Sequence, residues 1–331
     1  MSKKPLLTVC VPTIGRLEYL PMTRASLEKQ TFADYEIVIL DNASPEEAQE
    51  QLRAWAKDDS RVRILRTDPR IPMFENFNRG IREAKGKYVV FFHDDDMYLP
   101  EFLSTYVGML ERYPSAAIAG GNFDFVDTEG KLDDVRRWIP KTELWSGRRY
   151  IDSMMRRGRN VIPMPGLVFR RDVLGDGFDT KLPIHFGDFV LLMRIAETND
   201  LAMVAEPLVH IRRHSAQASQ SMPMSRAVAL RSEVLKDYVD EFLKRHPAEV
   251  ARASDYRKRI EVLHRVGMLW GWFAAKDHEE AEACLELLGD RALDRTVSRA
   301  LGAVESAGIK QIVSKSKMFV IARRLGGYLG V

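Results

Sequence analysis

Three adjacent aspartates, Asp94, Asp95 and Asp96, follow His93 at the end of a short apolar run that covers residues 88–92. An apolar run that ends in charge is typical of a buried strand in a parallel sheet, because the carboxyl ends of such strands form the edge where ligands bind. Adjacent carboxylates repel one another unless water, a proton or a cation neutralises them. Carboxylate oxygens suit hard ions such as Mg2+ or Mn2+, and Mg2+ usually joins carboxylates to substrate phosphates. A solvated acidic loop after a strand explains an isolated triple aspartate equally well, so the neighbouring elements must decide.

Apolar runs and helical patterns alternate through the first part of the chain. Strands are expected at residues 6–11, 35–40, 61–65 and 88–92, and helices at 17–30, 45–57, 76–85 and 100–112. Ser44 is expected to cap the second helix, and Gly86 to close the third. This alternation predicts a parallel sheet with helices on both faces. Asp41 then shares an edge with the triple aspartate, where a nucleotide fits physically: Asp41 can accept hydrogen bonds from a base or ribose, and a metal ion can hold the diphosphate.

The rest of the chain divides into two parts. Residues 101–224 contain a Pro- and Gly-interrupted apolar segment at 161–169, a helix at 186–197 that carries Asp188 near its start, and short strands that end at His214. Helical periodicity dominates from residue 225 onward. We therefore expect a domain at 1–224, with a nucleotide-binding half at 1–100 and an acceptor half at 101–224, followed by a helical region at 225–331.

The composition excludes several classes of protein. The 331 residues are 45% hydrophobic and 29% charged, which is ordinary for a globular protein, and the net charge of +3 does not indicate a nucleic-acid partner. The two cysteines, Cys10 and Cys284, are far apart and fit small buried hydrophobes in a reducing compartment. No signal peptide and no membrane span are expected. These features favour a cytoplasmic protein and leave its oligomeric state open.

The C-terminal segment after Glu305 contains no acidic residue. Its basic residues are Lys310, Lys315, Lys317, Arg323 and Arg324. Such a segment could lie peripherally on the anionic inner face of a membrane. A terminal helix that docks on the protein and exposes a basic face to water is the alternative that we favour.

Three stretches together resemble one family of enzymes. VCVPTIGR, VILDNASP and NFNRGIREAKGKYVVFFHDDDMYLPEFL agree in order, spacing and residue type with the family 2 glycosyltransferases, which have the GT-A fold; the likeness covers about residues 6–221. The resemblance implies a Rossmann-like α/β fold with a mostly parallel sheet flanked by helices. It also implies transfer of a sugar from a nucleotide-diphosphate donor, most often a UDP-sugar, with inversion and with Mn2+ or Mg2+. The type of acceptor stays open: the hydroxyl could belong to a lipid-linked glycan, a polysaccharide end or a protein.

The resemblance implies that the nucleotide is held by the ends of the first strands and by the third helix. The residues at the matching positions are Pro12, Thr13, Arg16, Asp41, Asn78 and Arg79, together with Asp94 and Asp95.

The metal motif of the family commonly reads Asp-x-Asp-Asp, and in that alignment His93 replaces the first aspartate. We expect Asp96 to bind the metal directly and Asp94 to bond the ribose or a metal-bound water. His214 resembles a histidine that closes over the diphosphate and can bind the metal.

Asp188 matches the acidic residue that serves as catalytic base in the family. An acceptor hydroxyl is a poor nucleophile, so a base must remove its proton as it attacks. The leaving diphosphate needs its charge stabilised, and Arg212 or Arg213 could do so beside the metal. A carboxylate that only stabilises a helix N-terminus is the simpler reading of Asp188 taken alone.

Two other functions are compatible with a similar α/β core. A sugar-nucleotide nucleotidyltransferase would need a Gly-rich basic loop after the first strand, whereas PTIGR contains one glycine. A non-catalytic carbohydrate-binding relative of the GT-A enzymes would be expected to lose the metal carboxylates or the base, and none is lost here.

Overall fold

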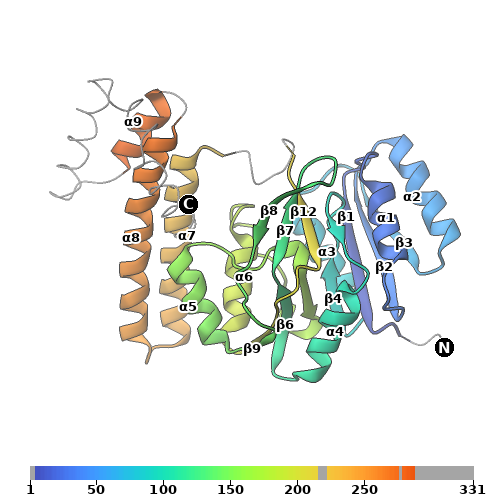
Figure 1. Ribbon diagram of the computed structural model, residues 1–331, viewed down its shortest axis with the longest axis horizontal. Coiled ribbons are helices and arrows are strands. Elements are labelled where there is room, and N and C mark those ends of the chain that lie inside the picture. Colours follow the sequence, from blue (N-terminus) through green and yellow to red (C-terminus); the bar gives the residue numbers. More distant parts are fainter. Residues whose placement is uncertain (1–3, 215–221, 276–277, 288–331) are drawn as a thin grey trace. The chain divides into compact units, whose positions relative to one another are not determined.

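The computed structural model describes residues 4–214, 222–275 and 278–287 (Figure 1). The chain forms two compact units: Met1–Ile151 with Val161–Ala218, and Asp152–Asn160 with Ser219–Val331. The sequence did not indicate that the second unit takes a piece from the middle of the chain. The domain boundary at residue 224 stays a prediction.

The first unit is built on a sheet of eight strands. Their order across the sheet is β3 (Val62–Thr67), β2 (Tyr35–Asn42), β1 (Leu7–Thr13), β4 (Tyr88–Phe91), β10 (Leu167–Arg170), β6 (Ala116–Gly121), β11 (Asp200–Val204) and β9 (Glu143–Trp145). Strands β3, β2, β1 and β4 are parallel, whereas β10 and β9 run antiparallel to their neighbours. The predicted α/β class with a mostly parallel sheet is confirmed. Strand β10 lies between the short 3-10 helices η1 (Met164–Gly166) and η2 (Arg171–Leu174). A strand was expected at the end of the apolar segment 161–169, but its reversed direction was not predicted.

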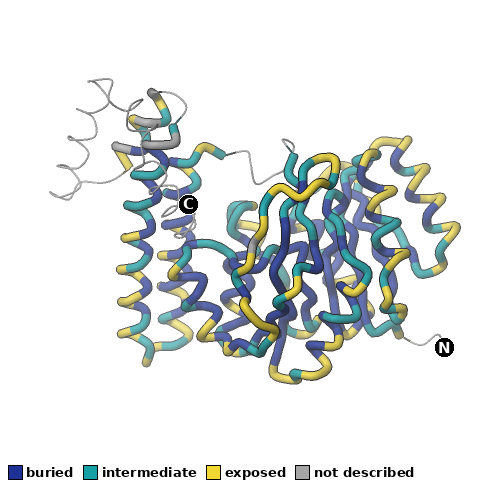
Figure 2. The backbone as a smooth tube through the Cα atoms, viewed as in Figure 1, coloured by how far each residue is buried: buried dark blue, intermediate teal, exposed yellow. Residues whose placement is uncertain are grey.

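Helices cover both faces of this sheet. Helices α1 (Leu20–Glu28), α2 (Glu46–Asp58) and α4 (Phe102–Arg112) share one apolar cluster with strand residues such as Val9 and Val90. Helix α3 (Met73–Glu83) lies on the other face, where a Cβ on Gly80 would come within 2.7 Å of Leu40. Because both faces are covered, the central strands are buried along their length (Figure 2). This explains why they read as continuous apolar runs.

Two of the predicted helix ends are wrong. Pro45, not Ser44, occupies the N-cap of α2, and the backbone N–H of Ser44 instead donates to Asp41 Oδ1 at 2.9 Å. Helix α3 ends at Glu83 with Ala84 as its C-cap, so Gly86 does not close it. Gly86 has a packing role, because a Cβ there would lie 2.6 Å from the backbone of Leu7.

A second sheet contains four short strands in the order β5 (Met97–Tyr98), β12 (Val209–Arg212), β7 (Phe123–Val126) and β8 (Leu132–Arg136). Strand β12 pairs with β5, which follows the triple aspartate directly. The second sheet therefore brings the end of β12 to the acidic residues at the edge of the main sheet. Helices α5 (Gly147–Arg157) and α6 (Gly187–Ala196) complete the elements before residue 215.

The second unit contains helices α7 (Met224–Arg245), α8 (Val250–Ala274) and α9 (His278–Glu286). Val228 of α7 and Met268 of α8 are buried together between the two long helices. The predicted helical C-terminal region is confirmed for the described residues. Among them, no helix combines the length and the apolar character that crossing a membrane would require. The predicted helical region beyond residue 287, with its basic C-terminal segment, lies outside the described residues.

Candidate active site

Asp94 is held by the loop that follows β1. Its Oδ2 accepts a hydrogen bond of 2.6 Å from Thr13 Oγ1, and its Oδ1 accepts one of 2.8 Å from Arg16 Nη1. The backbone N–H of Gly15, which has a φ of 82°, donates to the same threonine hydroxyl and shapes the loop. Burial, followed by the charge of Asp95, raises the pKa of Asp94 to about 6. Asp94 is therefore a buried carboxyl that fixes the loop to the acidic cluster, which we define as His93, Asp94, Asp95 and Asp96.

Asp95 is the most accessible aspartate of this cluster, with 14% of its side chain exposed. Its Oδ2 accepts a hydrogen bond of 3.1 Å from Arg16 Nη1 and lies 3.1 Å from His214 Nε2. Arg16 thus joins Asp94 to Asp95, while His214 reaches the same carboxylate from the segment after β12. The predicted residues Thr13, Arg16, Asp95 and His214 come together at one place.

Asp96 is buried, and its Oδ1 accepts the backbone N–H of Arg212 at 3.0 Å. Burial, and next the charge of Asp95, raise its pKa well above the usual range. His93 Nδ1 lies 3.9 Å from Asp96 Oδ2. The other ring nitrogen of His93, Nε2, is buried and has no hydrogen-bond partner among the described residues.

His93, Asp95 and Asp96 each offer one ligand atom, and these atoms all lie within 4.8 Å of one another. Two carboxylates and an imidazole form a donor set that suits Mn2+ or another divalent ion, and an unpartnered buried nitrogen fits this use. The expected set of Asp96, Asp94 and His214 differs from this one. Both carboxylate oxygens of Asp94 accept hydrogen bonds, from Thr13 and Arg16, and His214 contacts the Asp95 carboxylate.

Asp41 lies at the end of β2, beside Thr13 in the register of the sheet. It is buried, and its Oδ2 accepts a hydrogen bond of 2.7 Å from Arg66 Nη1. The sequence analysis missed Arg66, although it follows the apolar part of β3 and is paired with Asp41 in register. Arg79 lies in the same corner and donates to the carbonyl oxygen of Arg66 at 3.3 Å. Each carboxylate oxygen of Asp41 keeps a further lone pair for a ligand.

Two other predicted nucleotide contacts have different surroundings. Asn78 is buried, and its amide donates to the carbonyl oxygen of Phe178 at 2.8 Å and accepts the backbone N–H of Phe178 at 2.7 Å. These contacts give Asn78 a structural role, and its contact with the nucleotide stays a prediction. Pro12 lies within β1, opposite Leu40 of β2, one residue before Thr13.

The two arginines that were expected at the phosphate are occupied elsewhere. Arg212 is buried, and its guanidinium donates to the carbonyl oxygens of Asp95 at 3.0 Å, Asp127 at 3.0 Å and Thr128 at 2.7 Å. Arg213 forms an ion pair of 2.6 Å with Asp133 of β8. Arg212 therefore holds loop carbonyls together, and Arg16 contacts the carboxylates of Asp94 and Asp95. The role of Arg212 and Arg213 at the phosphate stays a prediction.

Asp188 lies in the first turn of α6, and its Oδ1 accepts the backbone N–H of the next residue at 2.8 Å. The preceding Gly187 packs so closely on Phe74 that a Cβ would lie 2.2 Å from the ring. Phe74 contacts Phe77 with ring centroids 6.4 Å apart, and Phe77 contacts His93 at 5.8 Å. The start of α6 is thus connected to the acidic cluster through two aromatic rings. The role of Asp188 as a base stays a prediction.

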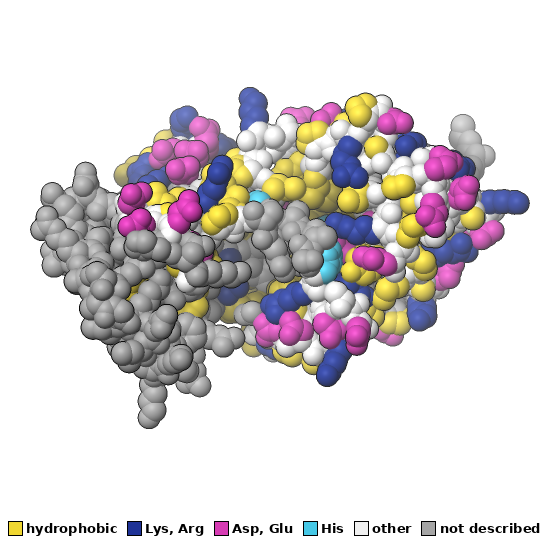
Figure 3. Space-filling model, turned by 90° about the horizontal axis from the view of Figure 1, so that it is seen from above, with side chains coloured by type: hydrophobic (Ala, Val, Ile, Leu, Met, Phe, Trp, Pro, Cys, Tyr) yellow, Lys and Arg dark blue, Asp and Glu magenta, His cyan; other side chains and the backbone are white. Residues whose placement is uncertain are grey.

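The surface carries acidic and basic side chains side by side (Figure 3), in agreement with the net charge of +3.

The model of the family described as glycosyl transferase family 2 matches residues 8–178. The chain belongs to glycosyltransferase family 2. The match contains Thr13, Asp41 and the whole acidic cluster.

Curated relatives of this family 2 chain include two bacterial glycosyltransferases. Glycosyltransferase GlyG of Streptococcus pneumoniae is 26% identical over 127 residues, which are 38% of this chain and 42% of that protein. The GalNAc(5)-diNAcBac-PP-undecaprenol beta-1,3-glucosyltransferase of Campylobacter jejuni is 34% identical over 102 residues, 30% of this chain and 33% of that protein. The alignments therefore span less than half the length of either relative.

Solved structures share the fold at low sequence identity. Residues 1–349 of S. aureus TarS in complex with UDP-GlcNAc match with a TM-score of 0.65 at 16% identity, covering 86% of this chain and 80% of that one. The mannosyltransferase PcManGT from Pyrobaculum calidifontis, in complex with GDP-Man and Mn2+, matches with a TM-score of 0.53 at 16% identity, covering 95% and 89%.

Proposed function

We propose that the protein is a metal-dependent, inverting glycosyltransferase that moves a sugar from a nucleotide-diphosphate donor, a UDP-sugar, to a hydroxyl of a glycan or lipid-linked acceptor. The observation that carries the proposal is the meeting of Thr13, Arg16, Asp95 and His214 at the carboxyl edge of the sheet, in a chain of family 2. Two structural neighbours were solved with UDP-GlcNAc and with GDP-Man and Mn2+, which supports a nucleotide-sugar donor here.

The nucleotide would lie along the ends of β1, β2 and β4. The Asp41 carboxylate accepts a hydrogen bond from Arg66 and can accept further ones from the base or ribose. Arg16, one quarter of whose side chain is exposed, would attract the diphosphate while it stays joined to Asp94 and Asp95.

His93, Asp95 and Asp96 would hold the divalent ion, which when bound neutralises charge on the leaving diphosphate. His214 would orient the Asp95 carboxylate through the contact at 3.1 Å. The clamp that Arg212 forms on the backbone of Asp95 would keep the turn of the acidic cluster in place.

Asp188 would remove the proton from the acceptor hydroxyl as that oxygen attacks the anomeric carbon. The bond from the anomeric carbon to the diphosphate breaks in the same displacement, so the sugar inverts and no enzyme nucleophile is needed. The first turn of α6 favours an ionised carboxylate at this position, because the helix dipole is positive there.

A donor screen tests the proposal. Purified protein with MnCl2 and a panel of UDP-, GDP- and dTDP-sugars should release one nucleoside diphosphate, and EDTA should abolish the release. Consumption of a nucleoside triphosphate with a sugar 1-phosphate would instead indicate a nucleotidyltransferase. If no nucleotide sugar binds or turns over with MnCl2 or with EDTA, the proposal is wrong.

A further inference from the structure

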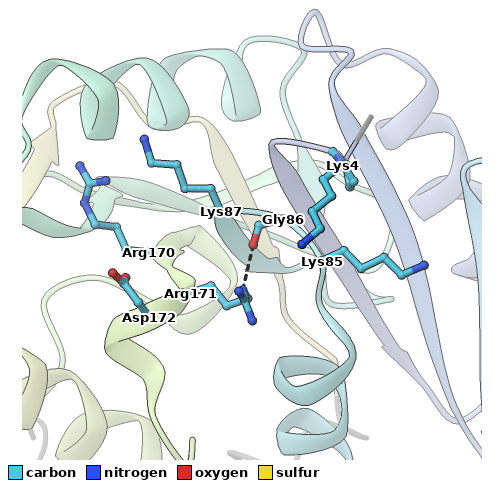
Figure 4. Close-up of a pocket in the computed structure, with 8 residues that line it drawn as sticks. Lys4, Lys85, Gly86, Lys87, Arg170, Arg171 and Asp172 are labelled. Carbon is cyan, nitrogen blue, oxygen red and sulfur yellow. Dashed lines mark hydrogen bonds between the residues drawn. The ribbon is translucent and has the colours of Figure 1, made fainter. Parts of the chain in front are cut away.

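A cavity of about 410 Å3 opens at the edge of the main sheet opposite to the acidic cluster (Figure 4). Small-ligand sites commonly have volumes of about 300–1,000 Å3. Five cationic side chains and one carboxylate line it: Lys4, Lys85, Lys87, Arg170, Arg171 and Asp172. We call this cavity the basic pocket. The proposed reaction uses none of its residues.

The sheet topology creates the basic pocket. Strands β1 and β4 are parallel and both begin at this edge, where Leu7 is paired with Tyr88. Strand β10 runs antiparallel to β4 and ends there, where Arg170 is paired with the same tyrosine. The residues before β1, before β4 and after β10 therefore meet, although they are far apart in the sequence.

Two of the cations are fixed by the protein itself. Arg170 donates from Nε to the carbonyl oxygen of Ala116 at 2.6 Å and from Nη2 to that of Leu110 at 2.5 Å. Lys87 Nζ lies 2.7 Å from Glu111 Oε1. Because the protein itself uses these donors, we do not expect Lys87 and Arg170 to bind a ligand directly.

Three other cations have donors left over. Arg171 is anchored by one bond, from Nε to the carbonyl oxygen of Gly86 at 3.0 Å, and its terminal nitrogens make no hydrogen bond within the described residues. Lys4 and Lys85 form no ion pair with any carboxylate of residues 4–214, 222–275 or 278–287. In Figure 4, Lys4 and Arg171 both extend toward Gly86. A planar guanidinium and flexible ammonium groups around one cavity are the donors that phosphate oxygens accept.

We propose that the basic pocket binds a phosphate-bearing anion, with Lys4 and Arg171 as its ligands. Glu111 already pairs with Lys87, and an anion in the pocket would offset the repulsion among the other cations that line it. The anion can be a free diphosphate or the headgroup of an anionic phospholipid. The proposal is independent of the reaction proposed above, because the two sites lie at opposite edges of the sheet.

The test compares two double variants with equal loss of charge. Lys4→Gln with Arg171→Gln removes pocket ligands, whereas Lys29→Gln with Lys57→Gln removes exposed lysines elsewhere in the first unit. Isothermal titration with sodium pyrophosphate in EDTA measures a free anion, and sedimentation with phosphatidylcholine vesicles, with and without phosphatidic acid, measures a headgroup. Urea unfolding checks that each variant is folded.

The pocket variant should bind its anion at least about tenfold more weakly than the wild type, and the control variant should bind like the wild type. Loss in the pyrophosphate titration identifies a free anion, and loss only with phosphatidic acid vesicles identifies a headgroup. Equal binding by the wild type and both variants would overturn the proposal, as would failure of the wild type to bind either probe.

Discussion

His214 Nε2 lies 3.1 Å from Asp95 Oδ2, although the two residues are 119 positions apart in the sequence. The contact exists because β12 pairs with β5, the strand that follows the acidic cluster, and the chain continues from β12 to His214. The same pairing directs the backbone N–H of Arg212 to Asp96. The second sheet therefore assembles the acidic cluster from two distant segments.

His214→Ala should weaken Mn2+ binding in the presence of UDP by about 10- to 100-fold, because Asp95 would lose the group that orients it. His214→Gln keeps a side-chain donor and should lose less. Titration of Mn2+ at saturating UDP measures both effects. His210→Ala, in strand β12 four residues before His214, is the matched control. Equal affinity of the His214→Ala variant and the wild type would show that the histidine has no part in metal binding.

Asp188→Asn should lower transfer by about 100- to 10,000-fold, because an amide cannot accept the proton of the acceptor hydroxyl. Its affinity for UDP with Mn2+ should stay near that of the wild type. Single-turnover transfer and UDP titration separate the two quantities. A variant that retains most of its transfer activity would remove Asp188 as the base.

Arg212→Ala should destabilise the fold by about 2 kcal/mol or more, because several buried backbone carbonyls lose their donor. Arg213→Ala removes a partly exposed ion pair and should cost about 1 kcal/mol or less. Urea unfolding of both variants measures the difference. If Arg212→Ala leaves stability unchanged and weakens only donor binding, the arginine is a phosphate ligand after all.

Asp94 should make the metal-free protein less stable as the pH rises from about 4 to 6. Burial raises its pKa from 3.8 in the unfolded chain to about 6, so between these values the folded state binds more protons. The free energy of unfolding must then fall with increasing pH, by about 1–3 kcal/mol for this group.

Asp94→Asn removes that titration, so its unfolding free energy relative to the wild type should increase between pH 4 and pH 7. Urea unfolding in EDTA at both pH values gives the comparison. A difference between the variant and the wild type that does not change with pH would contradict the raised pKa.

The parallel half of the sheet could be predicted because burial on both faces leaves a local trace, the continuous apolar runs at β1, β2 and β4. The family resemblance, which the match to the family 2 model confirms, could also be recognised from the sequence, because its motifs directly follow these strands. The order and direction of the strands in the sheet cannot be predicted from such local patterns. Nothing near β10 indicates that it runs backwards between β4 and β6, and the basic pocket depends on that reversal.

The surroundings of several site residues depend on contacts that the sequence does not show. Arg212 and Arg213 were expected beside the diphosphate, but consecutive residues of an extended chain point to opposite sides. One arginine is buried against loop carbonyls, and the other pairs with Asp133. The hydrogen-bond partner of Asn78, Phe178, is 100 residues away in the sequence. Such roles depend on tertiary contacts that a single sequence does not specify.

The central claim is that His93, Asp95 and Asp96 hold a divalent ion beside the donor diphosphate. Anomalous diffraction from a crystal soaked with UDP and MnCl2 tests it most directly. The account predicts one manganese peak within coordination distance of these three side chains and of the diphosphate oxygens. A manganese peak elsewhere, or UDP bound away from Asp41 and the acidic cluster, would contradict it.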